Sequence, residues 1–159
     1  MRVRSLGFYQ GPLKKAVLGL KSAGQRSLLP ALAEALAELI EGPWVLVGVP
    51  AVASRKRYRG FEPAVELARA VARATGLEHR QSLVCVVEPG EQKFLSAQQR
   101  EANLSGVFQA VGAVPERVLL VDDVVTTGAT LKACAQALGQ VAVLEGLCLA
   151  RVPRRSPEA

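Results

Sequence analysis

The chain has 159 residues, half of them apolar, which is the size and composition of one globular domain. No run of about 18 or more uncharged apolar residues occurs, so the sequence predicts no membrane span, and no secretory signal is expected. Three isolated cysteines and one histidine do not form a zinc-binding pattern. We therefore expect a cytoplasmic protein that keeps its cysteines as small buried residues: Cys85, Cys134 and Cys148.

The net charge is +6, and the basic residues gather in three clusters. The first precedes Glu34, the first acidic residue, the second occupies residues 55–59 and the third residues 151–155. Basic clusters attract polyanions without sequence specificity. The third cluster is interpreted as a solvated surface, whereas the first two also suit a polyphosphate substrate.

Residues 3–9 are predicted to form a short edge strand. A Gly-Pro pair opens a helix over residues 11–24, and a second helix is predicted over residues 27–40, with Ser27 as its N-cap. Both helices precede the first core strand. Residues 1–43 are therefore interpreted as a small helical hood or flap, or as helices packed on one face of a sheet.

The apolar run over residues 44–49 is predicted to form the first buried strand of a parallel sheet. The loop that follows contains four cations: Arg55, Lys56, Arg57 and Arg59. Fixed positive charge at this place can receive a pyrophosphate leaving group, and an arginine fork matches phosphate oxygens in pairs. A surface loop or a nucleic-acid patch is the alternative interpretation.

Helices and strands alternate in the rest of the chain, as in an α/β fold with a mainly parallel sheet flanked by helices. Glycine and proline signals bound a helix over residues 62–75. Strands are predicted over residues 83–87, 106–110 and 117–121. His79 follows the helix stop and is expected on the surface.

Residues 88–104 form a long polar stretch between two of these strands. The last strand is predicted over residues 141–150. We assign the core domain to residues 44–151 and expect residues 152–159 to be a disordered tail.

Residues 119–130 are the most informative stretch, Leu-Leu-Val-Asp-Asp-Val-Val-Thr-Thr-Gly-Ala-Thr. A buried strand leads to Asp122 and Asp123 at its end, and a hydroxyl-rich turn leads into a helix. Ligands of open α/β sheets bind beyond the carboxyl ends of strands, and a helix N-terminus attracts phosphate. Because two carboxylates suit ribose hydroxyls or Mg²⁺, the stretch predicts a sugar 5-phosphate site. Capping of the helix by Asp and Thr is the structural alternative.

This stretch resembles the phosphoribosyl-pyrophosphate (PRPP) signature of type I phosphoribosyltransferases: an apolar strand, two acidic residues, a spacer and Thr-Thr-Gly-x-Thr. The resemblance implies the type I phosphoribosyltransferase fold. It also implies that Asp122 and Asp123 hold the ribose hydroxyls, directly or through Mg²⁺. The 5-phosphate would be bound by Thr126, Thr127, Gly128, Ala129 and Thr130.

In that class, a flexible loop closes over the reacting centre and excludes water. Residues 88–104 occupy the corresponding place in the chain order. Candidate contacts from this loop are Gln92, Lys93, Ser96, Arg100 and Asn103, and Arg100 would join the four cations at the pyrophosphate. The alternative is a surface loop with a short helix over residues 96–103.

Further residues of one pattern are Lys21, Arg57-Tyr58-Arg59-Gly60-Phe61-Glu62, Gln92, Leu95, Arg100, Asn103 and Gly106-Val107-Phe108. This combination resembles the ComF/GntX family of phosphoribosyltransferase-like bacterial proteins linked to competence for DNA uptake. Many members have a four-cysteine zinc module ahead of the first basic helix, which has no counterpart here, so zinc is not expected. Glu62 also stands where the family usually has Asn.

Three functions are compatible with these features. The first is transfer of phosphoribosyl from Mg²⁺-PRPP to an unidentified nitrogen acceptor, with release of pyrophosphate. The second is a competence accessory role, in which the chain binds single-stranded DNA or a DNA-uptake partner and PRPP is a regulator or a vestige. The third is PRPP sensing without turnover. No general base is evident, oligomerisation is left open, and stacking candidates are few: Phe8, Tyr9, Phe61 and Phe94.

Overall fold

The computed structural model describes residues 1–51, 60–86 and 106–153. The first half of the chain forms β1 (Val3–Phe8), α1 (Gly11–Lys21), the 3₁₀ helix η1 (Ala23–Leu28), α2 (Leu29–Ala37), β2 (Val45–Gly48) and α4 (Pro63–Thr75). The second half forms β3 (Glu78–His79), β4 (Leu83–Cys85), β5 (Phe108–Ala110), β6 (Arg117–Val125), α6 (Ala129–Leu138) and β7 (Val143–Arg151).

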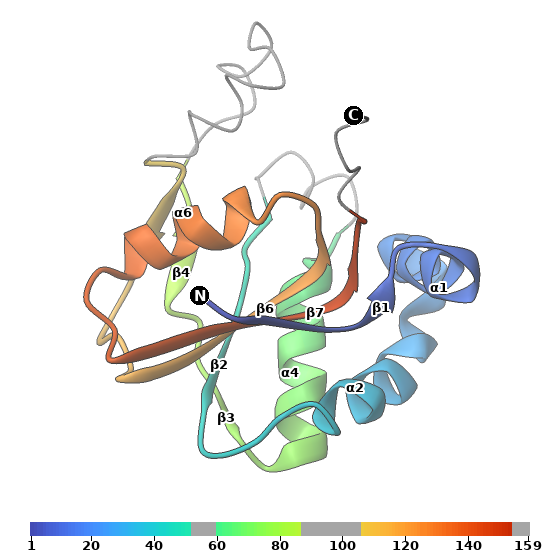
Figure 1. The fold of residues 1–159 in the computed structure, drawn as a ribbon, viewed down its shortest axis with the longest axis horizontal. Coiled ribbons are helices and arrows are strands. Elements are labelled where there is room, and N and C mark those ends of the chain that lie inside the picture. Colours follow the sequence, from blue (N-terminus) through green and yellow to red (C-terminus); the bar gives the residue numbers. More distant parts are fainter. Residues whose placement is uncertain (52–59, 87–105, 154–159) are drawn as a thin grey trace, which may run out of the picture.

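Five strands form a parallel sheet in the order β1-β7-β6-β2-β3 (Figure 1). The predicted edge strand is β1, and the predicted mainly parallel sheet is confirmed. β4 and β5 lie outside this sheet and pair antiparallel with each other. Sequence reasoning missed β3, because two residues are too few to show an alternating pattern.

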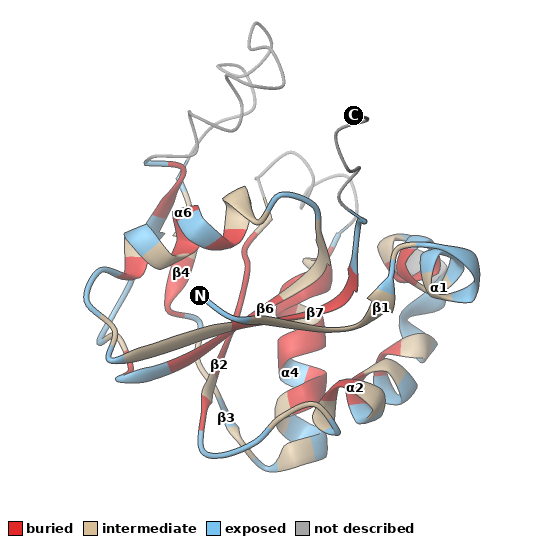
Figure 2. Ribbon diagram, in the orientation of Figure 1, coloured by how far each residue is buried: buried red, intermediate tan, exposed pale blue. Residues whose placement is uncertain are grey.

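Side chains of β6 alternate between two hydrophobic cores. Leu119 and Val121 pack with residues of α1, α2 and α4, whereas Val118 and Leu120 pack with residues of α6. Figure 1 shows α2 and α4 on one side of the sheet and α6 on the other. Buried residues accordingly concentrate in the central strands and along α4 (Figure 2). Cover on both faces explains why these strands are almost continuously apolar in sequence.

The N-terminal helices share the core of α4. Val17 and Leu20 of α1 and Leu36 of α2 are fully buried, in the same hydrophobic cluster as Val121 of β6. This corresponds to packing on one sheet face, one of the two placements that the sequence left open. α1 lies beyond the carboxyl end of β1 (Figure 1), so it borders the sheet edge at which a ligand is expected.

The predicted N-cap at Ser27 is wrong. Ser27 lies inside η1, and α2 begins at Leu29 with Pro30 in its first turn. Proline already has the backbone angle of a helix start, so it can open α2 directly after the 3₁₀ turn. α2 therefore begins without a cap from the Ser27 side chain.

The helix predicted over residues 62–75 is confirmed as α4, and Gly76 ends it in the left-handed conformation at φ 74°. The strand predicted to end at residue 121 instead continues to Val125. Its pairing with β7 begins at Arg117, opposite Val143, and continues past Asp122, opposite Cys148, to Val125, opposite Arg151. Among the described residues, every helix is too short or too polar to cross a membrane.

Candidate functional site

The two acidic residues of the motif lie within β6 and not after it. Because β6 remains extended, its successive side chains point to opposite faces. Asp122 projects toward the α6 side, where its charge affects Cys134 and Cys148. Asp123 projects toward the α1 side, where it meets Lys21. The two carboxylates therefore have different surroundings.

Asp122 sits in a poorly hydrated position. Burial raises the pKa of its carboxyl to about 7, and the neighbouring Asp123 charge adds to the rise. The Asp123 backbone N–H donates a hydrogen bond of 2.8 Å to Asp122 Oδ1 and, with Lys21, partly opposes the shift in pKa. Near neutral pH, this acid is thus poised between its two protonation states.

Asp123 is held by an ion pair. Lys21 Nζ, at the end of α1, lies 3.2 Å from Asp123 Oδ2, and the two side chains are 29% and 15% exposed. The pair joins the N-terminal helix to the carboxyl half of the central strand. Sequence reasoning placed Lys21 in the first basic cluster and in the family pattern. It did not pair Lys21 with Asp123, because an ion pair between distant segments leaves no local signal.

Asp122 and Asp123 do not have the arrangement of a direct Mg²⁺ site. Carboxylate oxygens are suitable Mg²⁺ ligands, but these two point to opposite faces and Asp123 already has a cationic partner. In the described parts of the chain, no three His, Cys, Asp or Glu side chains gather as metal ligands. The pair therefore does not fit a metal chelate by itself.

The turn after β6 presents hydroxyl and backbone N–H groups at the start of a helix. Thr126 and Thr127 are exposed, and Gly128 has φ 84° immediately before α6. Thr127 Oγ1 accepts a hydrogen bond of 3.3 Å from the Ala129 N–H, which fixes the turn. The first N–H groups of a helix have no intrahelical partners. They combine with the hydroxyls and the helix dipole to attract an anion at this end of α6.

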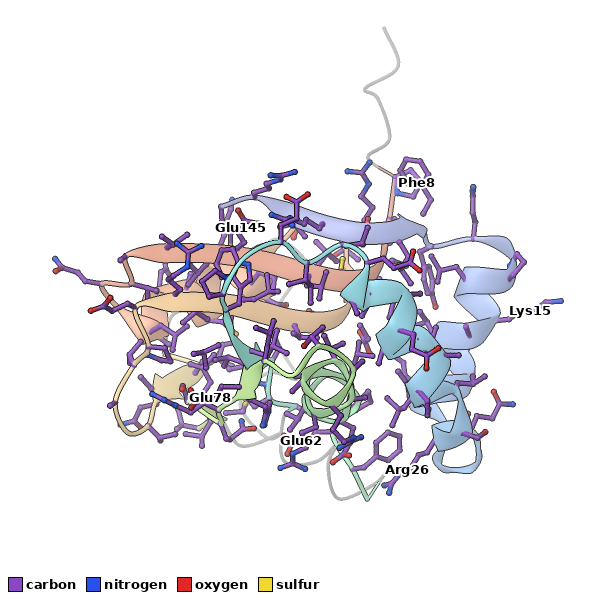
Figure 3. The ribbon with its side chains drawn as sticks, turned by 90° about the horizontal axis from the view of Figure 1, so that it is seen from below. Phe8, Lys15, Arg26, Glu62, Glu78 and Glu145 are labelled. Carbon is purple, nitrogen blue, oxygen red and sulfur yellow. The ribbon has the colours of Figure 1, made fainter. Side chains whose placement is uncertain are left out.

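The loop predicted to bind pyrophosphate begins and ends close to the same sheet edge. Its base is closed by Glu62, whose Oε1 accepts a hydrogen bond of 3.1 Å from the Ala51 N–H. Phe61 is buried, and the Arg26 guanidinium lies 4.3 Å from the centre of its ring. Figure 3 shows Arg26 and Glu62 at the same end of the molecule. Sequence reasoning did not identify Glu62 or Arg26 as supports for this loop.

Several predicted site residues lie outside the described ranges, so their positions stay predictions. They are Arg55, Lys56, Arg57, Arg59, Gln92, Lys93, Ser96, Arg100 and Asn103. The described residues contain the sugar-phosphate half of the predicted site, namely Asp122, Asp123, Thr126, Thr127, Gly128, Ala129 and Thr130.

The remaining ionisable candidates are a histidine and the cysteines, and none has the surroundings of a reactive group. His79 is half-buried in β3, not on the surface as expected, and burial and the Arg69 charge lower its pKa. Cys134 and Cys148 are buried as predicted, whereas Cys85 is only partly buried. Burial raises the pKa of the Cys134 and Cys148 thiols. These thiols stay protonated and unreactive at neutral pH.

The fold matches known structures with a phosphoribosyltransferase architecture. The glutamine PRPP amidotransferase from B. subtilis aligns over 77% of this chain with a TM-score of 0.53 and 22% identity. A structure described as the allosteric regulatory enzyme of purine biosynthesis aligns over 77% with a TM-score of 0.52 and 22% identity. The chain spans about a quarter of the length of each, 26% and 25%. The protein has the type I phosphoribosyltransferase fold, as predicted.

Sequence comparison identifies the family. DNA utilization protein YhgH of Salmonella typhimurium is 31% identical over 163 aligned positions, covering 94% of this chain and 72% of the relative. Competence protein F of Haemophilus influenzae is 32% identical over 108 positions, covering 65% of this chain and 47% of the relative. No protein-family model matches the chain. The chain belongs to the ComF/GntX family of phosphoribosyltransferase-like proteins.

Proposed function

We propose that this protein binds PRPP with Mg²⁺ and transfers the phosphoribosyl group to a nitrogen acceptor, releasing pyrophosphate. The observation that supports this most directly is the turn between β6 and α6. There the exposed threonines, the left-handed Gly128 and the start of a helix lie directly after two acidic residues. This combination suits a ribose 5-phosphate, because hydroxyl and N–H donors meet the phosphate and carboxylates accept from the sugar.

In the proposed reaction, the bond from the anomeric carbon to pyrophosphate breaks and a bond to the acceptor nitrogen forms. The nitrogen loses a proton, and pyrophosphate leaves with the bonding electrons. Asp122 and Asp123 would hold the ribose, and residues 126–130 would hold the 5-phosphate. Cations of residues 55–59, with Arg100, would bind the leaving group, whose charge grows in the transition state. Mg²⁺ would be bound mainly by polyphosphate oxygens.

Calorimetric titration of Mg²⁺-PRPP tests the binding step. We expect binding by the wild type and a loss of affinity of at least tenfold in Asp122→Asn/Asp123→Asn, since each Asn replaces an acceptor oxygen with a donor. The exposed carboxylate Glu34 on α2 offers a control, and Glu34→Gln should bind like the wild type. Absence of PRPP binding by the wild type would reject the proposal. Binding without pyrophosphate release across a panel of nitrogen bases would instead favour a PRPP sensor.

A second candidate function is binding of single-stranded DNA. Phe8 is 43% exposed, and the Arg151 guanidinium lies 5.0 Å from the centre of its ring. Beside it, Lys14 Nζ lies 5.8 Å from the centre of the Tyr9 ring. Figure 3 shows Phe8 at the outer edge of the molecule. An exposed aromatic ring among cations, such as Phe8, is typical of surfaces that stack unpaired bases. The names of the relatives, DNA utilization protein and competence protein, support this candidate.

Fluorescence anisotropy with a labelled oligothymidine tests this surface. The affinity of the wild type should fall by about tenfold or more between roughly 50 and 200 mM salt, because phosphate contacts release counterions. Phe8→Ala should weaken binding and Phe8→Trp should preserve it, since only the latter keeps a ring for stacking. Undetectable binding at the lower salt concentration would remove this candidate.

A further inference from the structure

The ion pair between Lys21 and Asp123 is supported by the packing beneath it. Val17 and Leu20, in the last two turns of α1, are completely buried in the same cluster as Val121 of β6. Lys21 directly follows Leu20, and Asp123 lies two residues after Val121 on the same face of the strand. The hydrophobic contacts therefore place the ammonium beside the carboxylate, which distinguishes Lys21 from a lysine that extends freely into solvent.

The ion pair between Lys21 and Asp123 also reduces the charge repulsion within the acidic motif. Two carboxylates on consecutive residues repel each other, and a ligand with a 5-phosphate brings further negative charge. Lys21 Nζ, 3.2 Å from Asp123 Oδ2, places a positive charge beside this acidic pair. One ammonium offsets one carboxylate without blocking it, because a carboxylate has two oxygens and about four acceptor positions. Asp123 can thus keep its ion pair and still accept from a sugar hydroxyl.

We propose that Lys21 is a positioning residue of the sugar site, which orients Asp123 toward the ribose hydroxyls and supplies its countercharge. This inference rests on the proposed binding of PRPP, and it adds α1 as a structural part of that site. Docking of α1 on the sheet and binding of the sugar are then coupled. Any displacement of α1 would withdraw the cation that holds the ribose-facing carboxylate.

Variants of Lys21 separate this role from a purely structural one. The probes are ribose 5-phosphate, which reports on the sugar-phosphate half alone, and Mg²⁺-PRPP, both measured by calorimetry. Lys21→Met should lower the affinity for ribose 5-phosphate by about tenfold, the effect of losing a charged hydrogen bond. Lys21→Arg keeps a cation of sufficient length and should return the affinity to within about threefold of the wild type.

Lys15 on the same helix provides the matched control. It is exposed and points away from the body of the protein (Figure 3), so Lys15→Met removes the same charge at a distance and should leave both affinities unchanged. Thermal unfolding of all three variants confirms that they are folded during the titrations. If wild type binds and Lys21→Met binds equally well, or if Lys21→Arg is as weak as Lys21→Met, the positioning role is wrong. If wild type binds neither probe, the proposed function fails and this inference fails with it.

Discussion

Glu62 Oε1 accepts a hydrogen bond from the Ala51 N–H at 3.1 Å, across the two ends of the loop over residues 52–59. Glu62 is also the residue before the first turn of α4. The bond therefore ties the end of the segment after β2 to the start of the helix that supports the sheet. Glu62 therefore has a structural role, in which its carboxylate supplies the acceptor oxygen.

The first prediction concerns this bond. Glu62→Ala should reduce the free energy of unfolding by about 1 kcal/mol, since the Ala51 N–H loses its partner. Glu62→Gln keeps the acceptor oxygen and should lose less than half as much. Urea denaturation of the three proteins measures the difference. Equal losses in the two variants would show that the negative charge of Glu62, and not its acceptor oxygen, stabilises this region.

The second prediction concerns Gly128, whose φ of 84° favours glycine. A Cβ there would meet no atom within 4 Å, so Gly128→Ala acts through backbone strain alone. We expect a loss of about 1 kcal/mol in the free energy of unfolding. We also expect weaker binding of ribose 5-phosphate, because the turn over residues 126–130 would relax away from the left-handed conformation at Gly128.

Gly112 is the control for this substitution. Gly112 has φ 69°, and a Cβ there would also meet no atom within 4 Å. It lies between β5 and the amino end of β6, whereas the turn over residues 126–130 follows the carboxyl end of β6. Gly112→Ala should therefore cause a similar loss of stability with no change in ligand affinity. A parallel loss of affinity in both variants would show that the effect reflects general destabilisation.

The third prediction concerns pH. Because burial raises the pKa of Asp122 to about 7 from its usual 3.8, the folded chain retains a proton that the unfolded chain has released between these values. The contribution of Asp122 to stability is therefore highest at acidic pH and is lost as the pH rises through about 7. Asp122→Asn cannot ionise, so its stability relative to the wild type should improve as the pH rises from about 4 to about 7 and should level off above that.

Urea denaturation at several pH values checks this difference. His79, whose pKa is lowered, contributes a slope of the opposite sign, because its unfolded form binds a proton more readily below its usual pKa of 6.5. This slope is common to both proteins and cancels in the comparison. A difference between the two proteins that is constant with pH would contradict the raised pKa of Asp122.

Local sequence patterns were sufficient to predict the main elements and the turn between β6 and α6. Apolar runs predicted β2, β6 and β7, and the proline and glycine boundaries predicted α4. The motif of residues 119–130 predicted the fold class. These predictions succeeded because their determinants lie within a few residues of one another.

The remaining features depend on contacts between distant segments. The continuation of β6 to Val125 is imposed by pairing with β7, and that pairing places the two acids on opposite faces. The partnership of Lys21 with Asp123 likewise requires α1 to pack beside β6. Ser27 has a residue type suited to an N-cap, but the 3₁₀ turn around it left no such role. Tertiary packing decided each of these cases.

The last prediction concerns Gly48, where β2 meets α4 most closely. A Cβ at Gly48 would lie 2.5 Å from Val65 Cα and 3.0 Å from Ala64 O. Both are backbone atoms, so a rotamer change cannot relieve the contact and α4 itself would have to move. Gly48→Ala should therefore reduce the free energy of unfolding by about 3 kcal/mol, at the upper end of the usual effect of overpacking.

Gly7 in β1 is the matched control, because a Cβ there would lie 3.5 Å from Leu13 Cδ2, an ordinary side-chain contact. Gly7→Ala should change the free energy of unfolding by less than about 1 kcal/mol. Urea denaturation of both variants gives the comparison. β2 and α4 also lead into the two ends of the loop over residues 52–59, which are joined by the hydrogen bond between Ala51 and Glu62. Gly48→Ala should therefore weaken the binding of Mg²⁺-PRPP more than the binding of ribose 5-phosphate. Equal weakening of the binding of both ligands would show that displacement of α4 also disturbs the turn over residues 126–130.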